Sequence, residues 1–309
     1  MKILRNIGAS GPILIVTAAV LWALDGVIRR HLYSLPPITI IFFEHLVGLI
    51  IILPFVWKNF VKERPGKREF LLLLLVAVLS GLLGTLWFTT ALLKVHFISF
   101  SVVFLLQKLQ PIFAIASASI FLKEKFDHRY TRWALLALVS AYFVTFPNGH
   151  VNLSTGEGTA IAALYALGAA FAWGTSTTFS KMILNKVSYK VSTFYRFLIT
   201  TVIAFILILV SGYLPSLGTP TLPQFGLFAL IAVSTGVVAL MIYYKGLSKT
   251  PVHITTMLEL TFPFIAIFID MTLYNTTLSV SQLIFAVVLS FAIYKIAKLQ
   301  SNAVVIKTN

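Results

Sequence analysis

The sequence predicts an all-α membrane protein with ten transmembrane helices, arranged as two inverted five-helix repeats. Three observations predict this fold class: a high apolar content, ten apolar segments, and a similarity between the two halves of the chain. Of the 309 residues, 59% are hydrophobic and only 11% are charged, and the mean hydropathy is +0.95. A soluble domain of this length needs far more charge to cover its surface.

The apolar segments set the number of helices. Each is about long enough to cross a hydrocarbon core roughly 30 Å thick at about 1.5 Å per residue. The first segment follows Lys2 and Arg5 and could be a signal peptide. Its removal would delete one member of the repeat described below, so we expect it to be retained. The expected helices span residues 12–32, 36–57, 70–93, 97–122, 131–147, 158–180, 191–211, 223–245, 251–273 and 279–298.

Lysine and arginine fall mainly on one side of these ten helices. If the N-terminus is inside, 19 of the 24 basic residues lie on the inner side, and Arg29, Arg30 and Lys94 lie outside. Lys108 and Arg196 lie within spans. The positive-inside rule then places both termini of this multi-pass chain in the cytoplasm. The net charge of +15 needs no nucleic-acid partner, because the basic residues form no single patch.

The two halves of the chain align at a separation of about 151 residues. "VLWALDG" (20–26) matches "AFAWGTST" (170–177), "IIFFEHL" (40–46) matches "STFYRFL" (192–198), and "LLQKLQPIFAI" (105–115) matches "MLELTFPFIAI" (257–267). The paired positions are Trp22 with Trp173, Glu44 with Arg196, Gln107 with Glu259, and Pro111 with Pro263. Since each repeat has five helices, the second must be inverted relative to the first, as in many secondary transporters. We expect the repeats at residues 11–147 and 157–299.

The sequence resembles the EamA-like branch of the drug/metabolite transporter superfamily over essentially the whole chain. The resemblance rests on "LWA" (21–23), on "LLQKLQPIFAIASASIFLKEKF" (105–126), which contains a "FLxE" element at 121–124, and on a second tryptophan-containing helix at the midpoint. It implies export or exchange of a small organic metabolite. Two features depart from the family pattern and leave the substrate open. "FIDMTLYNTT" (268–277) has no matching glutamate, and Glu44 stands where a basic residue is common.

Polar residues inside the spans mark the expected substrate site. An ionisable group that faces lipid costs at least about 2.5–3.5 kcal/mol, so such groups normally face a cavity or a partner. A helical wheel places the polar residues of 97–122 on one side and aliphatic residues opposite. We expect Pro111 and Pro263 to kink their helices and to free a carbonyl near the membrane centre. The candidate substrate-binding or coupling residues are Trp22, Asp25, Glu44, Trp87, Gln107, Lys108, Gln110, Trp173, Arg196 and Glu259.

The charged candidates have two interpretations. Lys108 could hold a carboxylate of the substrate, and Glu259 could hold an amine or carry a coupling proton. Alternatively, Lys108 and Glu259 form only an ion pair, and Asp25 pairs with Arg29 one turn later. Arg196 lies near the cytoplasm, where it could serve a gate or a lipid headgroup. The tryptophans line the cavity, or they are core residues and interfacial anchors.

Together these features predict a secondary transporter that works by alternating access and is not an enzyme. "FEHL" (43–46) lacks the spacing of HExxH, "GTS" (174–176) lacks the second glycine of a nucleophile elbow, and the chain has no cysteine. We expect no cofactor and no metal. The resemblance implies an amino-acid-like cargo that crosses the cytoplasmic (inner) membrane, in which the chain lies as a multi-pass protein. A proton is a candidate coupling ion, and we expect a monomer or homodimer in the lipid bilayer. A channel or passive facilitator and a nucleotide-sugar-type carrier remain alternatives.

Overall fold

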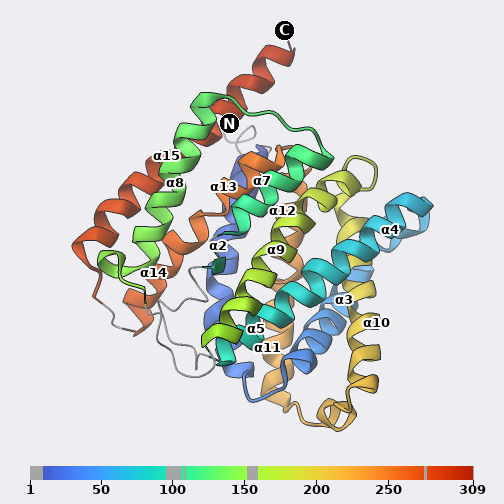
Figure 1. Ribbon diagram of the computed structural model, residues 1–309. Helices are drawn as coiled ribbons and strands as arrows, with labels where there is room; N and C mark the ends of the chain where they lie inside the picture. Colours follow the sequence, from blue (N-terminus) through green and yellow to red (C-terminus); the bar gives the residue numbers. More distant parts are fainter. Residues whose placement is uncertain (1–9, 95–105, 108, 152–158, 275–276, 309) are drawn as a thin grey trace, which may run out of the picture.

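The computed structural model describes residues 10–94, 106–107, 109–151, 159–274 and 277–308, and every regular element in this part of the chain is helical. The helices form one bundle, in which α2 begins and α15 ends toward the same end (Figure 1). In chain order the elements are α2 (Gly11–Arg29), η1 (Arg30–Leu32), α3 (Pro37–Lys62), α4 (Lys67–Val76), the π-helical η2 (Ala77–Gly84), α5 (Thr85–Lys94), α7 (Gln110–Phe121), α8 (His128–Thr145), η3 (Pro147–Gly149), α9 (Thr159–Leu184), α10 (Tyr189–Val210), η4 (Leu214–Gly218), α11 (Leu222–Val233), α12 (Val237–Leu247), α13 (Val252–Leu258), α14 (Thr261–Tyr274) and α15 (Val280–Thr308).

Within the described residues, eight helical stretches are long and apolar enough to cross a membrane. Two of the ten expected spans are not among them. From the expected span 97–122 the structure describes α7, a shorter apolar helix of 12 residues. The other is α8, whose first turns carry His128, Arg129 and Arg132. The eight stretches are Gly11–Arg29, Pro37–Asn59, Lys67–Lys94, Ala160–Leu184, Tyr189–Val210, Leu222–Leu247, Val252–Leu273 and Val280–Leu299.

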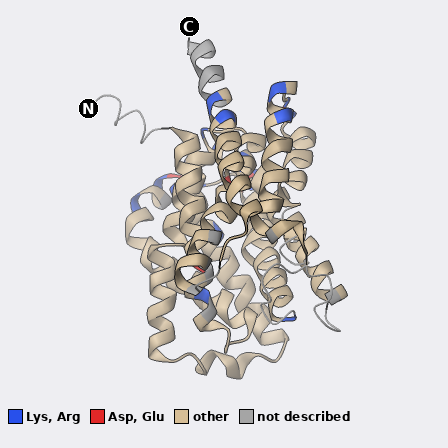
Figure 2. Cartoon of the chain, turned by 90° about the vertical axis from the view of Figure 1, so that its left-hand side faces the viewer, with Lys and Arg blue, Asp and Glu red and all other residues tan. Residues whose placement is uncertain are grey.

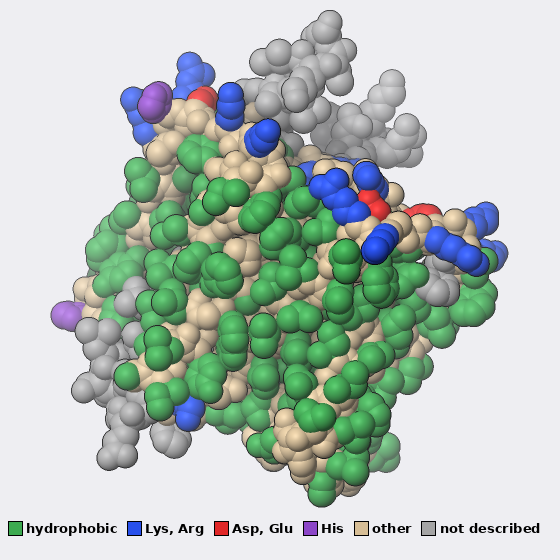
Figure 3. Space-filling model, turned by 45° about the vertical axis from the view of Figure 1, so that its right-hand side comes forward, with side chains coloured by type: hydrophobic (Ala, Val, Ile, Leu, Met, Phe, Trp, Pro, Cys, Tyr) green, Lys and Arg blue, Asp and Glu red, His purple; other side chains and the backbone are tan. Residues whose placement is uncertain are grey.

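The surface of the bundle is divided into an apolar belt and a basic end. Hydrophobic side chains cover the middle of the face shown in Figure 3, and lysine and arginine gather at one end of it. Figure 2 shows the same concentration of basic residues from another side. The chain is therefore built as a multi-pass membrane protein. We call the end that carries residues 58–68, 123–132, 181–190 and 245–249 the basic end, and the other the opposite end.

The helix contacts have the pattern of two related halves. α3 packs against α10, and α8 packs against α15. α2 packs against α12 and α14. In the other half, α9 packs against α5 and η2 and against α7. Each contact has its equivalent when the halves are exchanged, so the contacts fit the two-repeat layout.

Interruptions of the helices recur at equivalent positions in the two halves. The helix of the second half breaks at Glu259–Leu260, between α13 and α14, and the chain makes a turn at Leu109 just before α7. Leu109 and Leu260 are 151 residues apart, which is the separation of the two halves. Pro111 and Pro263 lie in the first turn of the helix that follows each break, where a missing N–H is tolerated.

One detail at these prolines differs from expectation. The carbonyl that Pro263 deprives of a helical partner belongs to Glu259. It accepts instead from the backbone N–H of Phe262 at 2.9 Å. The break therefore does not leave this carbonyl free, because the chain tightens to a three-residue hydrogen bond.

Candidate functional site

Glu259 lies at the helix break and is the centre of a polar group in the middle of the bundle. The Tyr243 hydroxyl donates to Glu259 Oε1 at 2.6 Å, and Gln110 Nε2 donates to Oε2 at 3.1 Å. These residues come from α13, α12 and α7 and thus from both halves. The break brings this about because it ends α13 at the carboxylate and lets α7 and α12 approach from two sides.

Further residues surround this carboxylate, from α2 and α9 and from the stretch before α7. Gln107 Nε2 lies 3.4 Å from Gln110 Oε1, and the hydroxyls of Thr177 and Tyr243 are 3.4 Å apart. The rings of Trp22 and Tyr243 lie 4.9 Å apart and are tilted. The central cluster is defined as Trp22, Gln107, Gln110, Thr177, Tyr243 and Glu259.

The structure bears in part on the prediction that Glu259 forms an ion pair. In the part of the chain that the structure describes, no salt bridge involves Glu259. Lys108 lies outside the described residues, so its pairing with Glu259 or with a solute stays a prediction. Tyr243 and Thr177, by contrast, were not candidates, because a tyrosine or threonine in an apolar helix looks like an ordinary packing residue.

A second polar group lies toward the opposite end, where α2 ends. Arg29 donates from Nε to Asp25 Oδ2 at 2.6 Å, and from Nη1 and Nη2 to the two oxygens of Glu44 at 2.8 and 3.0 Å. Thr235 donates to Asp25 Oδ1 at 2.6 Å. The side chains of Arg29, Asp25 and Glu44 are only 13, 20 and 10% exposed. These four residues form the ionic cluster.

The ionic cluster revises the role expected for two residues. The structure forms the Asp25–Arg29 pair that the four-residue spacing allows, and adds Glu44 to it. Arg29 had been counted among the outer charges, yet it is held between two carboxylates. One arginine thus serves both carboxylates: it binds Glu44 through two parallel hydrogen bonds, the strongest geometry for such a pair, and Asp25 through a third.

A third polar group surrounds Arg196 toward the basic end. Arg196 donates from Nη2 to Ser80 Oγ at 2.6 Å and from Nη1 to the Tyr244 hydroxyl at 3.1 Å. The Tyr244 hydroxyl is 3.2 Å from Ser180 Oγ, while Nε of Arg196 is buried and has no hydrogen-bond partner in the described part of the chain. Ser80, Ser180, Arg196 and Tyr244 form the hydroxyl cluster. Among the described residues no carboxylate forms a salt bridge with Arg196.

The three candidate tryptophans have different surroundings. Only Trp22 belongs to the central cluster. Trp173 donates from Nε1 to the Ser80 carbonyl at 3.3 Å and lies 5.3 Å from the Phe88 ring. Trp87 covers Gly168 of α9, where an added Cβ would lie 2.9 Å from its ring.

The "FLxE" glutamate joins the two halves at the basic end. Glu124 accepts hydrogen bonds from the backbone N–H groups of Val252 and His253 at 2.8 and 3.1 Å, and pairs with His253 Nδ1 at 2.6 Å. Burial acts to raise the pKa of Glu124, but the hydrogen bonds from His253 and from the two amides outweigh it, so the pKa is lowered. This motif residue thus fixes the start of α13 and, through it, the helix that ends at Glu259.

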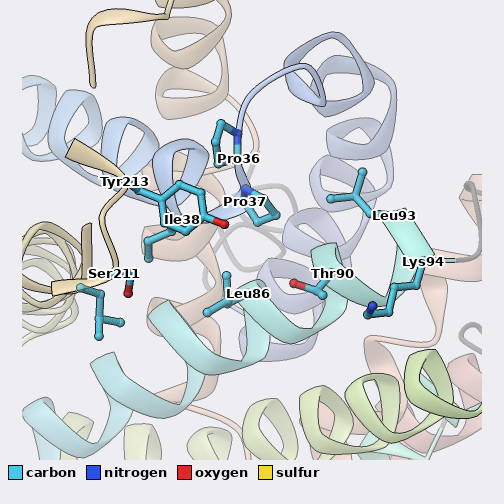
Figure 4. Close-up of a pocket in the computed structure, with 10 residues that line it drawn as sticks. Pro36, Pro37, Ile38, Leu86, Thr90, Leu93, Lys94, Ser211 and Tyr213 are labelled. Carbon is cyan, nitrogen blue, oxygen red and sulfur yellow. The ribbon is translucent and has the colours of Figure 1, made fainter. Parts of the chain in front are cut away.

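Two surface cavities lie away from these clusters. A cavity of about 460 Å³ opens at the opposite end, and its lining includes Pro37, Leu86, Thr90, Lys94 and Tyr213 (Figure 4). A second cavity of about 390 Å³ lies at the basic end beside Arg64 and Tyr195. Neither lining includes a residue of the central, ionic or hydroxyl cluster, so we place the candidate site at the central cluster on contacts and chemistry.

An all-helical membrane bundle with two related halves and polar clusters between them is the architecture of a small-molecule transporter. The chain belongs to the EamA-like transporter family, whose model matches residues 9–146 and 160–297.

Two comparisons add to the family match. The chain is 35% identical over 292 residues to the riboflavin transporter ImpX of Fusobacterium nucleatum subsp. nucleatum, covering 94% of this chain and 98% of that protein. A solved crystal structure of a protein matches with a TM-score of 0.74 and 14% identity, covering 94% of this chain and 98% of that one. At that identity the match shows the shared fold alone.

Proposed function

We propose that the protein is a secondary transporter that moves a neutral, planar heteroaromatic metabolite of the riboflavin type. It does so by alternating access across the cytoplasmic membrane, with the basic end in the cytoplasm. The observation that carries this proposal is the similarity to a riboflavin transporter over nearly the full length of both chains. The excess of basic residues at one end supports the orientation.

The chemistry of the central cluster supports a flat, polar, uncharged solute. A flavin ring has two apolar faces and a uracil-like edge that carries both a donor and acceptors. Trp22 and Tyr243 offer aromatic surface for the faces. Gln110 and Gln107 offer amides, which both donate and accept, and so match an edge of mixed polarity.

The charges of the described residues support an uncharged solute as well. A solute carboxylate requires a cation, and the central cluster has none among the described residues: Arg29 is held by Asp25 and Glu44, and Arg196 belongs to the hydroxyl cluster. A second candidate cargo is the amino-acid-like solute expected from the sequence. Glu259 favours it, because this carboxylate forms no salt bridge within the described residues and could accept an ammonium group.

Counterflow in proteoliposomes tests the proposal. Vesicles preloaded with unlabelled riboflavin should take up labelled riboflavin faster than empty vesicles, with saturation, and a mixture of amino acids should not compete. A Lys186→Gln variant is the matched control, because it removes only a surface ion pair with Glu69. Absence of riboflavin flux together with amino-acid exchange would favour the second candidate. Flux without saturation or stimulation by internal solute would indicate a passive pore.

A further inference from the structure

Glu44 and Arg196 occupy equivalent places in the two halves. Glu44 is the eighth residue of α3, which starts at the opposite end, and Arg196 is the eighth residue of α10, which starts at the basic end. At about 1.5 Å per residue, each lies roughly 10 Å into its helix. α3 and α10 pack against each other. The ionic and hydroxyl clusters are therefore counterparts in the two halves of one pseudo-symmetric bundle, displaced toward opposite ends, and Arg196 still acts electrostatically on Glu44.

Each cluster also attaches one half to an irregular segment of the other half. Asp25 of α2 accepts from Thr235, which lies between α11 and α12. In the reverse direction, Arg196 of α10 donates to the side chain of Ser80, and Trp173 of α9 donates to its carbonyl. Ser80 lies in the π-helical η2.

The two irregular segments share an unusual hydrogen-bond pattern. η2 is a π-helix, in which each N–H bonds to the carbonyl five residues earlier. Between α11 and α12, Gly236 N donates to Ile231 O at 2.7 Å and Ala239 N donates to Ser234 O at 3.1 Å, again five residues earlier. Such wide turns are sites where helices bend, and they are frequent at functional positions.

The central cluster lies between these two attachments. On α2, Trp22 precedes Asp25 by three residues in the direction of the opposite end. On α9, Thr177 precedes Ser180 by three residues in the direction of the basic end. On α12, Tyr243 belongs to the central cluster, and its neighbour Tyr244 belongs to the hydroxyl cluster. A solute bound at the centre would thus leave past one cluster or past the other.

We propose that the ionic cluster is the outer gate and the hydroxyl cluster the inner gate, each hinged at the irregular segment that it contacts. This inference rests on the proposed alternating access, and both gates are closed in this structure. The outer gate contains a bidentate ion pair, which is stronger than the hydrogen bonds between arginine and hydroxyls at the inner gate. The solute-free protein therefore opens more readily toward the cytoplasm.

Single-cysteine labelling tests the gates, since the native chain has no cysteine. Thr177→Cys places a reporter between the two clusters, and a membrane-impermeant maleimide is added to right-side-out or inside-out vesicles. Thr235→Val removes only the hydroxyl that bonds to Asp25 and leaves Arg29 with both carboxylates. It should raise labelling from the outside about fivefold, as expected for the loss of one buried hydrogen bond, with no rise from the inside. Ser80→Ala should do the reverse.

Two control variants distinguish a change at a gate from a general effect of substitution on labelling. Thr235→Ser keeps the hydroxyl and should restore the original labelling, and Lys186→Gln, which breaks a surface ion pair, should leave it unchanged. If Thr235→Val does not give a monodisperse protein, Glu44→Gln takes its place with the same expectation. Equal changes from both sides, or no change in a folded variant, would overturn the gates.

The labelling assay needs no substrate, so it fails independently of the transport assay. Side-specific labelling in a protein that does not exchange riboflavin would support the two gates and contradict riboflavin as the cargo. Riboflavin exchange without side-specific labelling would support riboflavin as the cargo and contradict the two gates.

Discussion

The ionic cluster and the hydroxyl cluster share a position but not a chemistry. Both include the eighth residue of the second helix of a half, and both reach an irregular segment of the other half. At the opposite end two carboxylates surround Arg29, whereas at the basic end Arg196 meets only hydroxyls within the described residues. The two halves therefore share the positions at which their helices are joined, but the interactions at these positions differ in strength. A transporter with identical ends would have no intrinsic preference for one side.

The largest expected difference between the clusters follows from removing their arginines. Arg29→Met leaves Asp25 and Glu44 buried without a counter-ion, so we expect a loss of about 3–5 kcal/mol of stability. Arg196→Met removes a cation that forms no salt bridge in the described part of the chain, together with its two hydrogen bonds to hydroxyls, and should cost less, about 1–3 kcal/mol. Melting temperatures in detergent measure both. A larger loss of stability for Arg196→Met than for Arg29→Met would contradict the conclusion that the ionic cluster is the stronger of the two.

Glu259 extends the comparison to the centre, because it is a carboxylate without the arginine that Glu44 has. Glu259→Gln keeps the size of the side chain but removes its charge and one of its two acceptor oxygens, which in the proposed function serve the transport cycle, so we expect transport to fall on the order of 100-fold. Expression and melting temperature should stay near those of the native protein. If Glu259 carries the coupling proton, exchange should persist in the variant while the dependence of uptake on external pH disappears. Native rates with native pH dependence would remove Glu259 from the site.

A glycine at a contact between helices allows a further comparison of the halves, which concerns steric packing alone and has a smaller expected effect on stability. A Cβ on Gly174 would lie 2.6 Å from the Gln110 carbonyl and 3.0 Å from Ala114 N, so α9 could no longer approach α7. The equivalent residue 151 positions earlier is Ala23, which the other half accommodates. We expect Gly174→Ala to destabilise the protein by about 1–3 kcal/mol. Gly226→Ala, with nothing within 4 Å, should be neutral or slightly stabilising, and an equal loss in both variants would contradict the contact.

The sequence was sufficient for the fold class and for the two-repeat layout, because both depend on local composition and on residue order. It located Glu259, Gln110 and Trp22, since polar or aromatic residues in an apolar span are conspicuous. The partners Tyr243 and Thr177 carry no such signal.

The irregular segments were not predictable from the residues that form them. Gly81, Gly84 and Gly236 permit wide turns, but they do not reveal that a side chain from the other half binds at each segment. Similarly, the spacing of Asp25 and Arg29 indicated their pairing, while the approach of Glu44 depends on how α2 and α3 pack. Contacts between distant helices are properties of the assembled bundle.

The smallest expected effect concerns Glu124, which has no counterpart in "FIDMTLYNTT" of the second half. Glu124→Gln loses much of the capping of α13 and should destabilise the protein by about 1 kcal/mol at neutral pH. Because the pKa of Glu124 is lowered in the folded protein, its stabilisation is fully present above the unfolded pKa of roughly 4.3. The stabilisation disappears as the pH falls through the lower folded pKa. Melting temperatures of the native and variant proteins should therefore differ at pH 7 and converge only as the pH falls from the unfolded pKa through the lower folded pKa. A constant difference across this range would mean that Glu124 acts through its shape and not through its charge.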